Sequence, residues 1–243
     1  MTDISIVIPM KNESENVAML LGEIAAACAG QDYEIIVVDD GSTDDTAARV
    51  RDAMADHPTL RLLQHPQSAG QSAGVHSGVL AAKGDIVCTL DGDGQNPPAE
   101  LPKLFAPLLR DATGRLGLVA GQRVGRQDTL SKRLASRFAN ALRARILRDG
   151  TRDTGCGLKG FRRDAFLRLP YFNHMHRYLP ALFKRDGWEV ALVDVSHRER
   201  HAGQSKYNNL QRALVGIHDL IGVSWLILRR KTAQPVEVER RDG

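Results

Sequence analysis

The sequence predicts an α/β fold built on a mostly parallel, doubly wound sheet. Short apolar runs rich in β-branched residues alternate with segments whose apolar residues recur at helical spacing, which is the order that parallel sheets require. The runs are almost continuously apolar, as in strands buried on both faces. Several of them end abruptly at Pro, Asp or Gly, as expected where functional loops begin at the carboxyl ends of strands.

The first unit of this fold lies in the opening forty residues. Residues 4–8 form an apolar run that a proline ends, and residues 34–38 form a second run that two aspartates end, so both are expected to be strands. Apolar residues at helical spacing predict an amphipathic helix over residues 17–28. Asn12, followed three residues later by Glu15, suggests a capping box before that helix.

The alternation continues to residue 90 and then becomes less regular. It predicts helices at residues 43–55 and 69–82 and strands at residues 60–63 and 86–90. Later apolar runs predict strands at residues 118–120 and 190–195, the second at an edge or returning to the sheet. A basic helix is expected at residues 130–147, a terminal amphipathic helix at residues 210–228, and a polar tail from residue 232.

The composition is that of one globular domain. The chain has 243 residues, of which 42% are hydrophobic and 26% charged, values close to globular averages. Lys and Arg exceed Asp and Glu by 33 to 29, and basic residues concentrate at residues 130–148 and 229–231. Such patches attract phosphate groups on nucleic acid or anionic lipid. The three cysteines are far apart and odd in number, which argues for a reducing compartment rather than a disulfide framework.

The sequence also bears on location. It does not open with a basic segment followed by a long apolar stretch, so we expect a cytoplasmic protein. The charge-free part of the late apolar segment, residues 220–228, is far shorter than the roughly 20 residues of a spanning helix. Its apolar stripe followed by Arg229, Arg230 and Lys231 is typical of a helix lying at an anionic membrane surface. A core-packing or dimer helix explains the stripe equally well.

Acidic residues follow three of the expected strands. Glu13 follows the first, Asp39 and Asp40 the second, and Asp91 and Asp93 the fourth. Ligands of such sheets bind beyond the carboxyl ends of the strands, so these side chains are expected around one crevice. Mg²⁺ prefers oxygen ligands and often takes one or two carboxylates together with substrate phosphates. The last pair can therefore hold a metal on a diphosphate, although an Asp-x-Asp alone is also typical of a solvated turn.

Three motifs occur along the chain in the order Pro9-Met10-Lys11-Asn12-Glu13, Asp39-Asp40-Gly41-Ser42 and Asp91-Gly92-Asp93-Gly94-Gln95. Together they resemble family 2 glycosyltransferases, and within them the dolichol-phosphate mannosyltransferase-like group of polyprenyl-phosphate glycosyltransferases. The resemblance covers roughly residues 4–206 and implies a GT-A catalytic domain over residues 1–206, with an amphipathic membrane-interface helix at residues 207–231 and a polar tail at residues 232–243. It implies a UDP- or GDP-linked sugar donor, a polyprenyl phosphate acceptor, and Mg²⁺ or Mn²⁺ as cofactor.

Position by position, the resemblance assigns site residues to four tasks. Nucleotide-sugar binding falls on Pro9, Glu13, Asp39, Asp40, Ser42 and Gln95, and metal binding on Asp91, Asp93 and Gln95. The catalytic set is Asp91, Asp93, Arg123, Arg200 and Lys206, and the acceptor set is Lys132, Arg133, Asp153 and Ser205. The sequence departs from the group's pattern at Lys11, where Tyr is common, and at Lys132-Arg133, where one Arg is expected. Asp153 is open to a second role, the orientation of a loop.

The resemblance, together with charge considerations, implies direct displacement with inversion at the anomeric carbon. A hydroxyl acceptor needs a general base, whereas the oxygen of a phosphate monoester is already anionic near neutral pH because its second pKa is about 6. The enzyme then has to position the substrates, neutralise the acceptor with Lys and Arg, and stabilise the departing diphosphate with the metal.

Two other functions stay open from the sequence. One is sugar transfer to a non-lipid acceptor, and the other is a non-enzymatic basic module that binds lipid or nucleic acid through residues 130–148. The second leaves the acidic strand ends unexplained, so nucleic acid is not an expected partner. The expected partners are the two substrates and an anionic membrane surface on the inner face of the cytoplasmic membrane. Relatives in the group often carry spanning helices, which leaves room for a separate integral membrane subunit.

Competing motifs are weaker. Residues 70–74 spell the Gly-x-Ser-x-Gly nucleophile elbow around Ser72, but the elbow requires a strand directly before it. We expect instead a helix whose glycines pack closely on the sheet. Residues 155–160 spell a dinucleotide fingerprint without a clear strand before them or a long helix after them. The sequence contains no Cys-x-x-Cys and no His-x-x-x-His pair on an expected helix, so a zinc site has little support and His174 and His176 are expected to be loop or packing residues.

Overall fold

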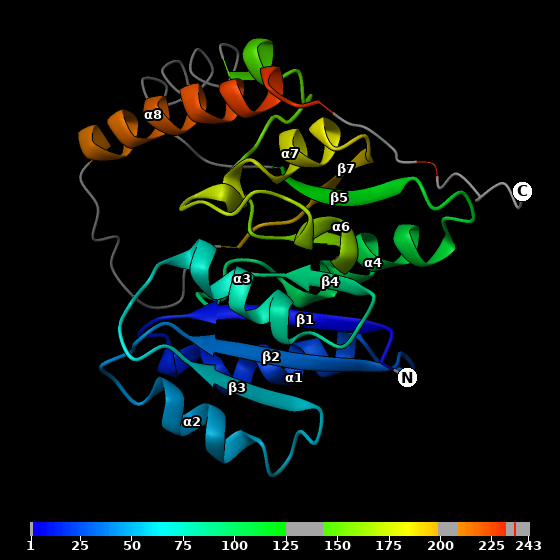
Figure 1. The fold of residues 1–243 in the computed structure, drawn as a ribbon. Helices are drawn as coiled ribbons and strands as arrows, with labels where there is room; N and C mark the ends of the chain where they lie inside the picture. The colour runs from blue at the N-terminus through cyan, green and yellow to red at the C-terminus, as the bar shows by residue number, and fades with distance from the viewer. Residues whose placement is uncertain (1, 125–142, 199–208, 232–235, 237–243) are drawn as a thin grey trace, which may run out of the picture.

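The computed structural model describes residues 2–124, 143–198, 209–231 and 236. Its strands form one seven-stranded sheet in the order β3-β2-β1-β4-β6-β5-β7, seen from bottom to top in Figure 1. The strands are β1 Ile4–Met10, β2 Tyr33–Asp39, β3 Leu60–Gln64, β4 Ile86–Thr89, β5 Leu116–Arg123, β6 Lys159–Arg162 and β7 Glu189–Val195. The α/β architecture expected from the sequence is confirmed.

The helices follow the expected alternation in the first half of the chain. The α-helices are α1 Val17–Ala27, α2 Thr46–Ala53, α3 Gln71–Ala81, α4 Leu101–Arg110, α6 Arg163–Leu167, α7 Leu179–Arg185 and α8 Asn209–Leu228. Short 3₁₀ helices are η1 Ser14–Asn16, η2 Pro98–Glu100 and η3 Met175–Arg177. Of the expected basic helix at residues 130–147, only residues 143–147 are described, and they are helical.

The sheet is mostly parallel, as predicted. β1 pairs in parallel with β2 and β4, β2 with β3, and β5 with β7. β6 lies between β4 and β5 and is antiparallel to both. The sequence pattern missed β6, because a strand of four residues with Lys159 at its start and Arg162 at its end lacks an apolar run.

Two apolar layers enclose the sheet. One packs α1 and α4 against one face through residues such as Leu20, Ile24 and Leu104, and the other packs α3, α6 and α7 against the opposite face. In Figure 1 the second group lies in front of the sheet and the first behind it. The glycines of α3 make close packing possible, since a Cβ on Gly78 would lie 2.3 Å from Val7 Cγ1. The close helix-to-sheet packing expected from this segment is confirmed.

The predicted capping box before α1 is wrong. Asn12 adopts a left-handed backbone conformation with φ 55°, and η1 separates it from the helix. Its Oδ1 accepts the N–H of Thr43 at 2.8 Å, and its own N–H donates to Ser42 Oγ at 2.9 Å. Asn12 therefore ties the loop after β1 to the loop after β2 instead of starting a helix.

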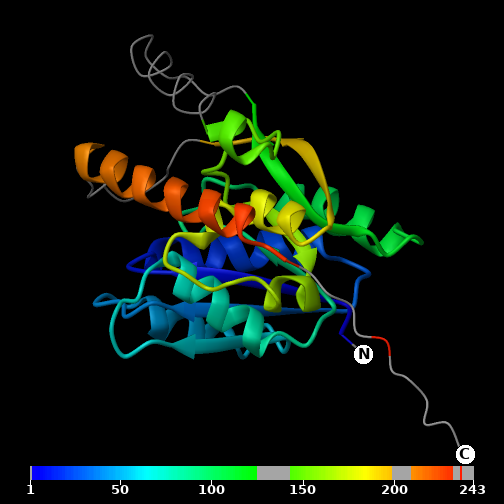
Figure 2. The ribbon, with the colours of Figure 1, turned by 45° about the horizontal axis from the view of Figure 1, so that its top comes forward.

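The terminal helix α8 runs across the molecule beside α7, as Figures 1 and 2 show. Val223 on its inner side is buried, and Leu220, Leu226 and Ile227 pack against the same apolar layer. Tyr178 Oη donates to the carbonyl of Gly216 at 3.3 Å. Among the described residues, no helix has the length and apolar content needed to cross a bilayer.

Candidate active site

The loops that follow β1, β2 and β4 meet at one edge of the sheet. The N–H of Asp40 donates to the carbonyl of Met10 at 2.8 Å, and the N–H of Glu13 donates to Thr46 Oγ1 at 2.9 Å. A Cβ on Gly92 would lie 2.7 Å from Met10 Cγ, so the loop after β4 is pressed against the end of β1. The strand ends therefore lie together at one edge of the sheet, as predicted. The pocket at that edge is lined by Pro9 and Asp91, and a crevice shared by all the acidic residues stays a prediction.

Two side-chain amides hold the carboxylate of Asp91. Gln71, the first residue of α3, donates from Nε2 to Oδ1 at 2.6 Å, and the buried Asn96 donates from Nδ2 to Oδ2 at 2.9 Å. Two residues further on, Asp93 Oδ1 accepts the backbone N–H of Gln95 at 3.1 Å. Burial and the neighbouring charge of Asp93 raise the pKa of Asp91, so without a counter-charge the ionised pair is unfavourable.

This donor set fits a hard divalent cation that shares its coordination with a substrate. Within the described ranges, no group of three or more His, Cys, Asp and Glu side chains can hold a metal. Two carboxylates completed by phosphate oxygens are, however, a usual Mg²⁺ environment. Gly157 makes room for the carboxylate of Asp91, because a Cβ at residue 157 would lie 2.3 Å from Asp91 Oδ2. The Oδ1 atom of Asn96 is buried without a hydrogen-bond partner, which leaves an oxygen acceptor beside the pair.

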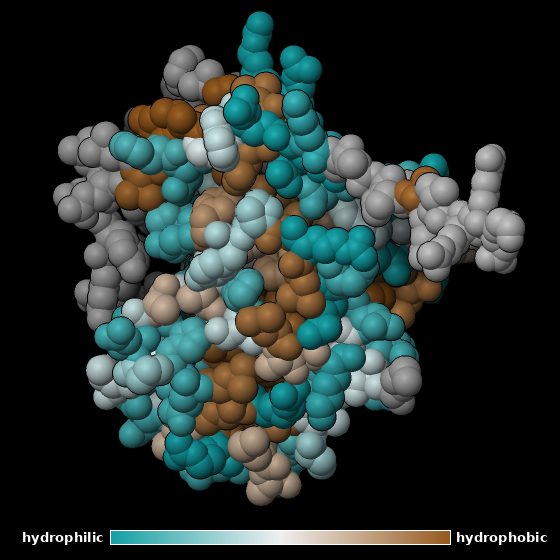
Figure 3. All heavy atoms as spheres, in the orientation of Figure 1, coloured by the Kyte–Doolittle hydropathy of each residue, from teal (hydrophilic) through white to brown (hydrophobic). Residues whose placement is uncertain are grey.

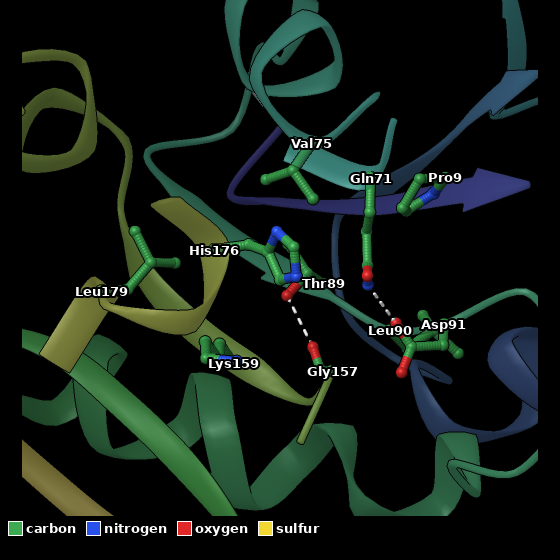
Figure 4. Close-up of a pocket in the computed structure, with 10 residues that line it drawn as sticks. All are labelled: Pro9, Gln71, Val75, Thr89, Leu90, Asp91, Gly157, Lys159, His176 and Leu179. Carbon is green, nitrogen blue, oxygen red and sulfur yellow. Dashed lines mark hydrogen bonds between the residues drawn. The ribbon is translucent and has the colours of Figure 1, made fainter. Parts of the chain in front are cut away.

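A buried lysine lies near Asp91, in a small pocket at this edge of the sheet. Figure 4 shows Lys159 from β6 and His176 from η3 among the residues that line the pocket with Asp91, Gln71 and Gly157. Lys159 is 5% exposed, and burial lowers its pKa. Burial and the charge of Lys159 hold the pKa of His176 well below its usual value, so this imidazole is neutral at pH 7.

Arg123, at the end of β5, is fixed by Asp153. Arg123 Nε and Nη2 donate to Asp153 Oδ2 and Oδ1 at 2.5 and 2.9 Å. The buried Gln122 prepares this pair, since its Oε1 accepts the backbone N–H groups of Arg152 and Asp153 at 2.8 and 3.0 Å. The charge of Arg123 also acts on Asp91, which places the predicted basic residue near the carboxylate pair.

The predicted nucleotide-binding acids have partners within the protein. Asp39 Oδ1 accepts the N–H of Ser42 at 3.1 Å. Both oxygens of Asp40 are bonded in the loop before α3, to the N–H of Ala69 at 2.8 Å and of Gly70 at 2.9 Å, with further bonds from His65 and Ser68. Burial opposes ionisation of Asp40, but these donors outweigh it and lower its pKa to about 2.

The remaining predicted residues divide into two groups. Pro9 lines the pocket beside Asp91, Glu13 Oε2 accepts a bond from Asn16 Nδ2 at 2.8 Å, and the backbone of Gln95 contacts Asp93. Nucleotide or metal binding by their side chains, and by those of Asp39, Asp40 and Ser42, stays a prediction. Lys132, Arg133, Arg200, Ser205 and Lys206 lie outside the described residues.

Sequence reasoning missed the residues that support the predicted ones. These are Gln71, Asn96, Gln122 and Lys159. Lys159 had no usable sequence signal, because β6 lacks the apolar run that would indicate a buried strand. The three amides had none either, because their hydrogen-bond partners are up to 31 positions away in the sequence.

The competing motifs are absent from the structure. Ser72 is buried inside α3, and its Oγ lies 2.7 Å from His176 Nδ1. The residues directly before α3 form a loop rather than a strand, so the nucleophile elbow is not formed. Residues 155–160 lead into β6 and are not followed by a long helix, so the dinucleotide fingerprint is accidental. His174 and His176 flank and form η3, as expected of loop and packing residues.

Sequence comparisons agree with this geometry. The profile of glycosyl transferase family 2 matches residues 5–169. An undecaprenyl-phosphate 4-deoxy-4-formamido-L-arabinose transferase of Pectobacterium carotovorum subsp. carotovorum (strain PC1) is 33% identical over 241 residues, which cover 97% of this chain and 69% of that protein. A transferase of the same description from Sodalis glossinidius (strain morsitans) is 35% identical over 223 residues, covering 90% of this chain and 66% of that protein. The chain thus spans about two thirds of the length of these relatives.

Solved structures share the fold. Glucosyl-3-phosphoglycerate synthase from Mycobacterium tuberculosis, in complex with Mn²⁺, UDP-glucose and glycerol 3-phosphate, has a TM-score of 0.68 at 22% identity, over 93% of this chain and 80% of that one. A mannosyltransferase from Pyrobaculum calidifontis, in complex with GDP-Man and Mn²⁺, has a TM-score of 0.67 at 20% identity, over 96% of this chain and 66% of that one. The expected GT-A fold is confirmed. With the family profile covering most of the chain, this protein belongs to glycosyltransferase family 2.

Proposed function

We propose that this chain transfers a sugar from a UDP- or GDP-linked donor to a polyprenyl phosphate, with Mg²⁺ or Mn²⁺ as cofactor. The observation that carries the proposal is that the carboxylate of Asp91 lies close enough to Asp93, Arg123 and Lys159 for its charge to interact with theirs. Such a site suits two substrates that both bear phosphate. The relatives are named as undecaprenyl-phosphate sugar transferases, which supports the same acceptor class.

On the donor side, the chain's own residues orient the two carboxylates. Gln71 and Asn96 fix the plane of Asp91 through its two oxygens, and Gln95 holds Asp93. A divalent cation bound there supplies positive charge to the departing nucleoside diphosphate. Preorganised ligands of this kind need little rearrangement during the reaction.

On the acceptor side, the charge of the phosphate decides the chemistry. A phosphate oxygen that is anionic near pH 7 needs no general base, and direct attack on the anomeric carbon inverts its configuration. Arg123, held in place by Asp153, neutralises charge near the point of attack. Arg200 and Lys206 are proposed for the same task from the sequence.

We also propose that α8 lies on the cytoplasmic face of the membrane that carries the acceptor. Ile217, Ile221, Trp225 and Leu228 recur at helical spacing and are 55–79% exposed, and Figure 3 shows hydrophobic surface gathered over α8 at the upper left. The adjacent Arg229 and Lys231 are exposed, as suits contact with anionic headgroups. Arg230 instead pairs with Asp186 of the folded domain.

One experiment tests the reaction directly. The purified protein is incubated with Mn²⁺ or Mg²⁺, undecaprenyl phosphate and a panel of UDP- and GDP-sugars that includes the 4-deoxy-4-formamido-L-arabinose donor. Release of diphosphate and sugar in the lipid phase are both followed. We expect metal-dependent lipid labelling with one donor. Release of the nucleoside diphosphate with the sugar recovered in a water-soluble product would move the acceptor to the non-lipid class. A protein that binds no donor would overturn the proposal.

A further inference from the structure

The chain leaves β7 along the loop that carries the carboxylate pair. Arg198, three residues beyond the end of β7, donates from Nε to the carbonyl of Gly94 at 2.6 Å. Its backbone N–H donates to the carbonyl of Gln95 at 3.1 Å. One residue thus binds two consecutive carbonyl groups in the loop between Asp91 and η2.

The first of these bonds acts on Asp93 through a single peptide plane. The carbonyl of Gly94 and the N–H of Gln95 belong to the same peptide unit, which is planar, so fixing one end fixes the other. The N–H end of that unit donates to Asp93 Oδ1 at 3.1 Å. Arg198 therefore sets the direction from which Asp93 receives its hydrogen bond. A hydrogen bond from a guanidinium to the carbonyl end also polarises the N–H end and strengthens the second bond.

Arg198 is itself held from the opposite side by α1. Its Nη1 and Nη2 donate to Glu23 Oε1 and Oε2 at 3.0 and 2.6 Å, a two-bond geometry that fixes the plane of the guanidinium. Ser196 secures the same segment by donating from Oγ to Glu100 Oε1 at 2.7 Å. Because α1 packs into the core through Leu20, Leu21 and Ile24, the arginine is anchored to a helix of the folded core.

We propose that Arg198 is a positioning residue for the metal-binding carboxylate Asp93, acting through the peptide unit between Gly94 and Gln95, and that Glu23 holds Arg198 in place. The inference deepens the proposed function, since it rests on Asp93 binding the metal. Neither residue is expected to touch substrate. Their contribution is to hold the carboxylate of Asp93 in one orientation through the hydrogen bond to Oδ1, as a ligand of a bound cation would require.

The test measures metal affinity without the transfer reaction. Free Mn²⁺ is followed by electron paramagnetic resonance as the whole protein is titrated in the presence of UDP and, in parallel, GDP. We expect Arg198→Met to weaken Mn²⁺ binding roughly 10- to 100-fold, the range for loss of a group that orients a metal ligand. Arg198→Lys is expected to lie between Met and wild type, because one ammonium cannot hold both Glu23 and the carbonyl of Gly94 in a fixed plane.

Arg115→Met is the matched control. Arg115 pairs with Glu189 at the opposite end of β7, and both are largely exposed. We expect wild-type Mn²⁺ affinity from this variant and a thermal midpoint close to that of wild type, because an exposed ion pair contributes little to stability. A role of Arg198 in stability alone would lower its midpoint and leave the metal affinity of the folded protein unchanged.

Glu23→Gln covers the case in which Arg198→Met does not fold. Glu23 lies on the outer side of α1 and is partly exposed, and the substitution keeps its shape but removes the charge. It is expected to weaken Mn²⁺ binding less than Arg198→Met does. Wild-type Mn²⁺ affinity in both Glu23→Gln and the folded Arg198 variants would overturn the inference. A wild-type protein that binds no Mn²⁺ with either nucleotide would overturn the metal-dependent function itself, which is a different result.

Discussion

Asp153 accepts two hydrogen bonds from Arg123, at 2.5 and 2.9 Å. Both side chains are about 15% exposed, so the pair is shielded from water. Asp153→Asn removes the charge and one acceptor, which frees the guanidinium to rotate. Since small displacements of a positioning group can cost about 100-fold in rate, we expect kcat/KM for the lipid phosphate to fall by about that factor in the variant. Initial rates against acceptor concentration measure it.

A second ion pair, at the opposite end of β5, provides the control. Arg162 Nη2 lies 3.3 Å from Asp111 Oδ2, near the start of β5 rather than its end. Asp111→Asn is expected to lower the thermal midpoint without changing the rate of the folded enzyme. Equal losses of rate in Asp111→Asn and Asp153→Asn would show that the effect of Asp153 is global.

Substitutions in the carboxylate pair are expected to reduce activity, and at Asp91 the same substitution is not expected to reduce stability without metal. Asp91→Asn and Asp93→Asn each should reduce transfer by roughly 1000-fold or more, because an amide is a weak ligand and transition-state charge is left uncompensated. Burial and Asp93 raise the pKa of Asp91, so the stability linked to its protonated form is lost as pH rises through that value. Metal-free Asp91→Asn should therefore be at least as stable as wild type at pH 7.

Thermal midpoints with and without Mn²⁺ and nucleoside diphosphate separate these two effects. Wild type should gain stability on their addition by mass action, and both variants should gain little. Full activity in either variant would contradict the assignment of the metal site.

Gly157 is expected to be irreplaceable for a steric reason. A Cβ would lie within 2.3–2.5 Å of the carboxylate atoms of Asp91, so Gly157→Ala must displace the carboxylate or the loop. We expect transfer to fall about 100-fold through the displaced ligand. Gly22→Ala in α1 is the control, since nothing lies within 4 Å of its Cβ position. That change should leave activity intact and stabilise the protein by roughly 0.5–1 kcal/mol. Similar activity in both variants would contradict a tight fit at Asp91.

The fold was predictable from the sequence as far as its periodic pattern extended. β1, β2 and β4 are apolar runs of buried residues, and the acids that follow them meet because parallel strands end at the same edge. β6 was not predictable, because its place in the sheet depends on pairing with β4 and β5 rather than on local composition. The same holds for Asn12, whose hydrogen bonds are made with a loop about 30 residues away.

The predicted site residues differ in how fully the sequence described them. For Asp91, the strand end and the acidic neighbour were enough to indicate a metal, but its two amide partners come from α3 and from the loop before η2. For Asp40 the sequence indicated a ligand contact, whereas the structure shows four donors from residues 65–70 bonded to its carboxylate. Sequence patterns locate charged side chains at strand ends, but tertiary contacts decide which of their atoms are already bonded.

Asp40 should accordingly contribute to stability in a pH-dependent way. Its pKa is lowered from 3.8 to about 2, so its contribution is present above the unfolded value and is lost as pH falls through about 4 toward about 2. Asp40→Asn is expected to lower the free energy of unfolding by roughly 2 kcal/mol at pH 7, with a smaller difference at pH 3. Urea unfolding at both pH values measures it. The exposed Asp56→Asn is the control; a deficit of Asp40→Asn that does not change with pH would contradict the linkage.

The last prediction concerns membrane binding by the exposed face of α8. Ile221 and Trp225 are 65% and 59% exposed, whereas Val223 between them is buried in the domain, so substitutions on the outer face spare the packing of the helix. If that face inserts into a lipid surface, the double change Ile221→Gln with Trp225→Gln should lower binding to anionic vesicles by about tenfold or more, since burying each apolar side chain contributes roughly 1.5–3 kcal/mol. Leu109→Gln on α4, where the leucine is 45% exposed, should bind as wild type does.

Co-sedimentation with phosphatidylglycerol vesicles measures binding, and transfer to a short, water-soluble polyprenyl phosphate should be equal in all three proteins because the active site is untouched. Unchanged vesicle binding in the double variant, together with a shift from dimer to monomer without lipid, would instead assign the face to a contact between two copies of the chain.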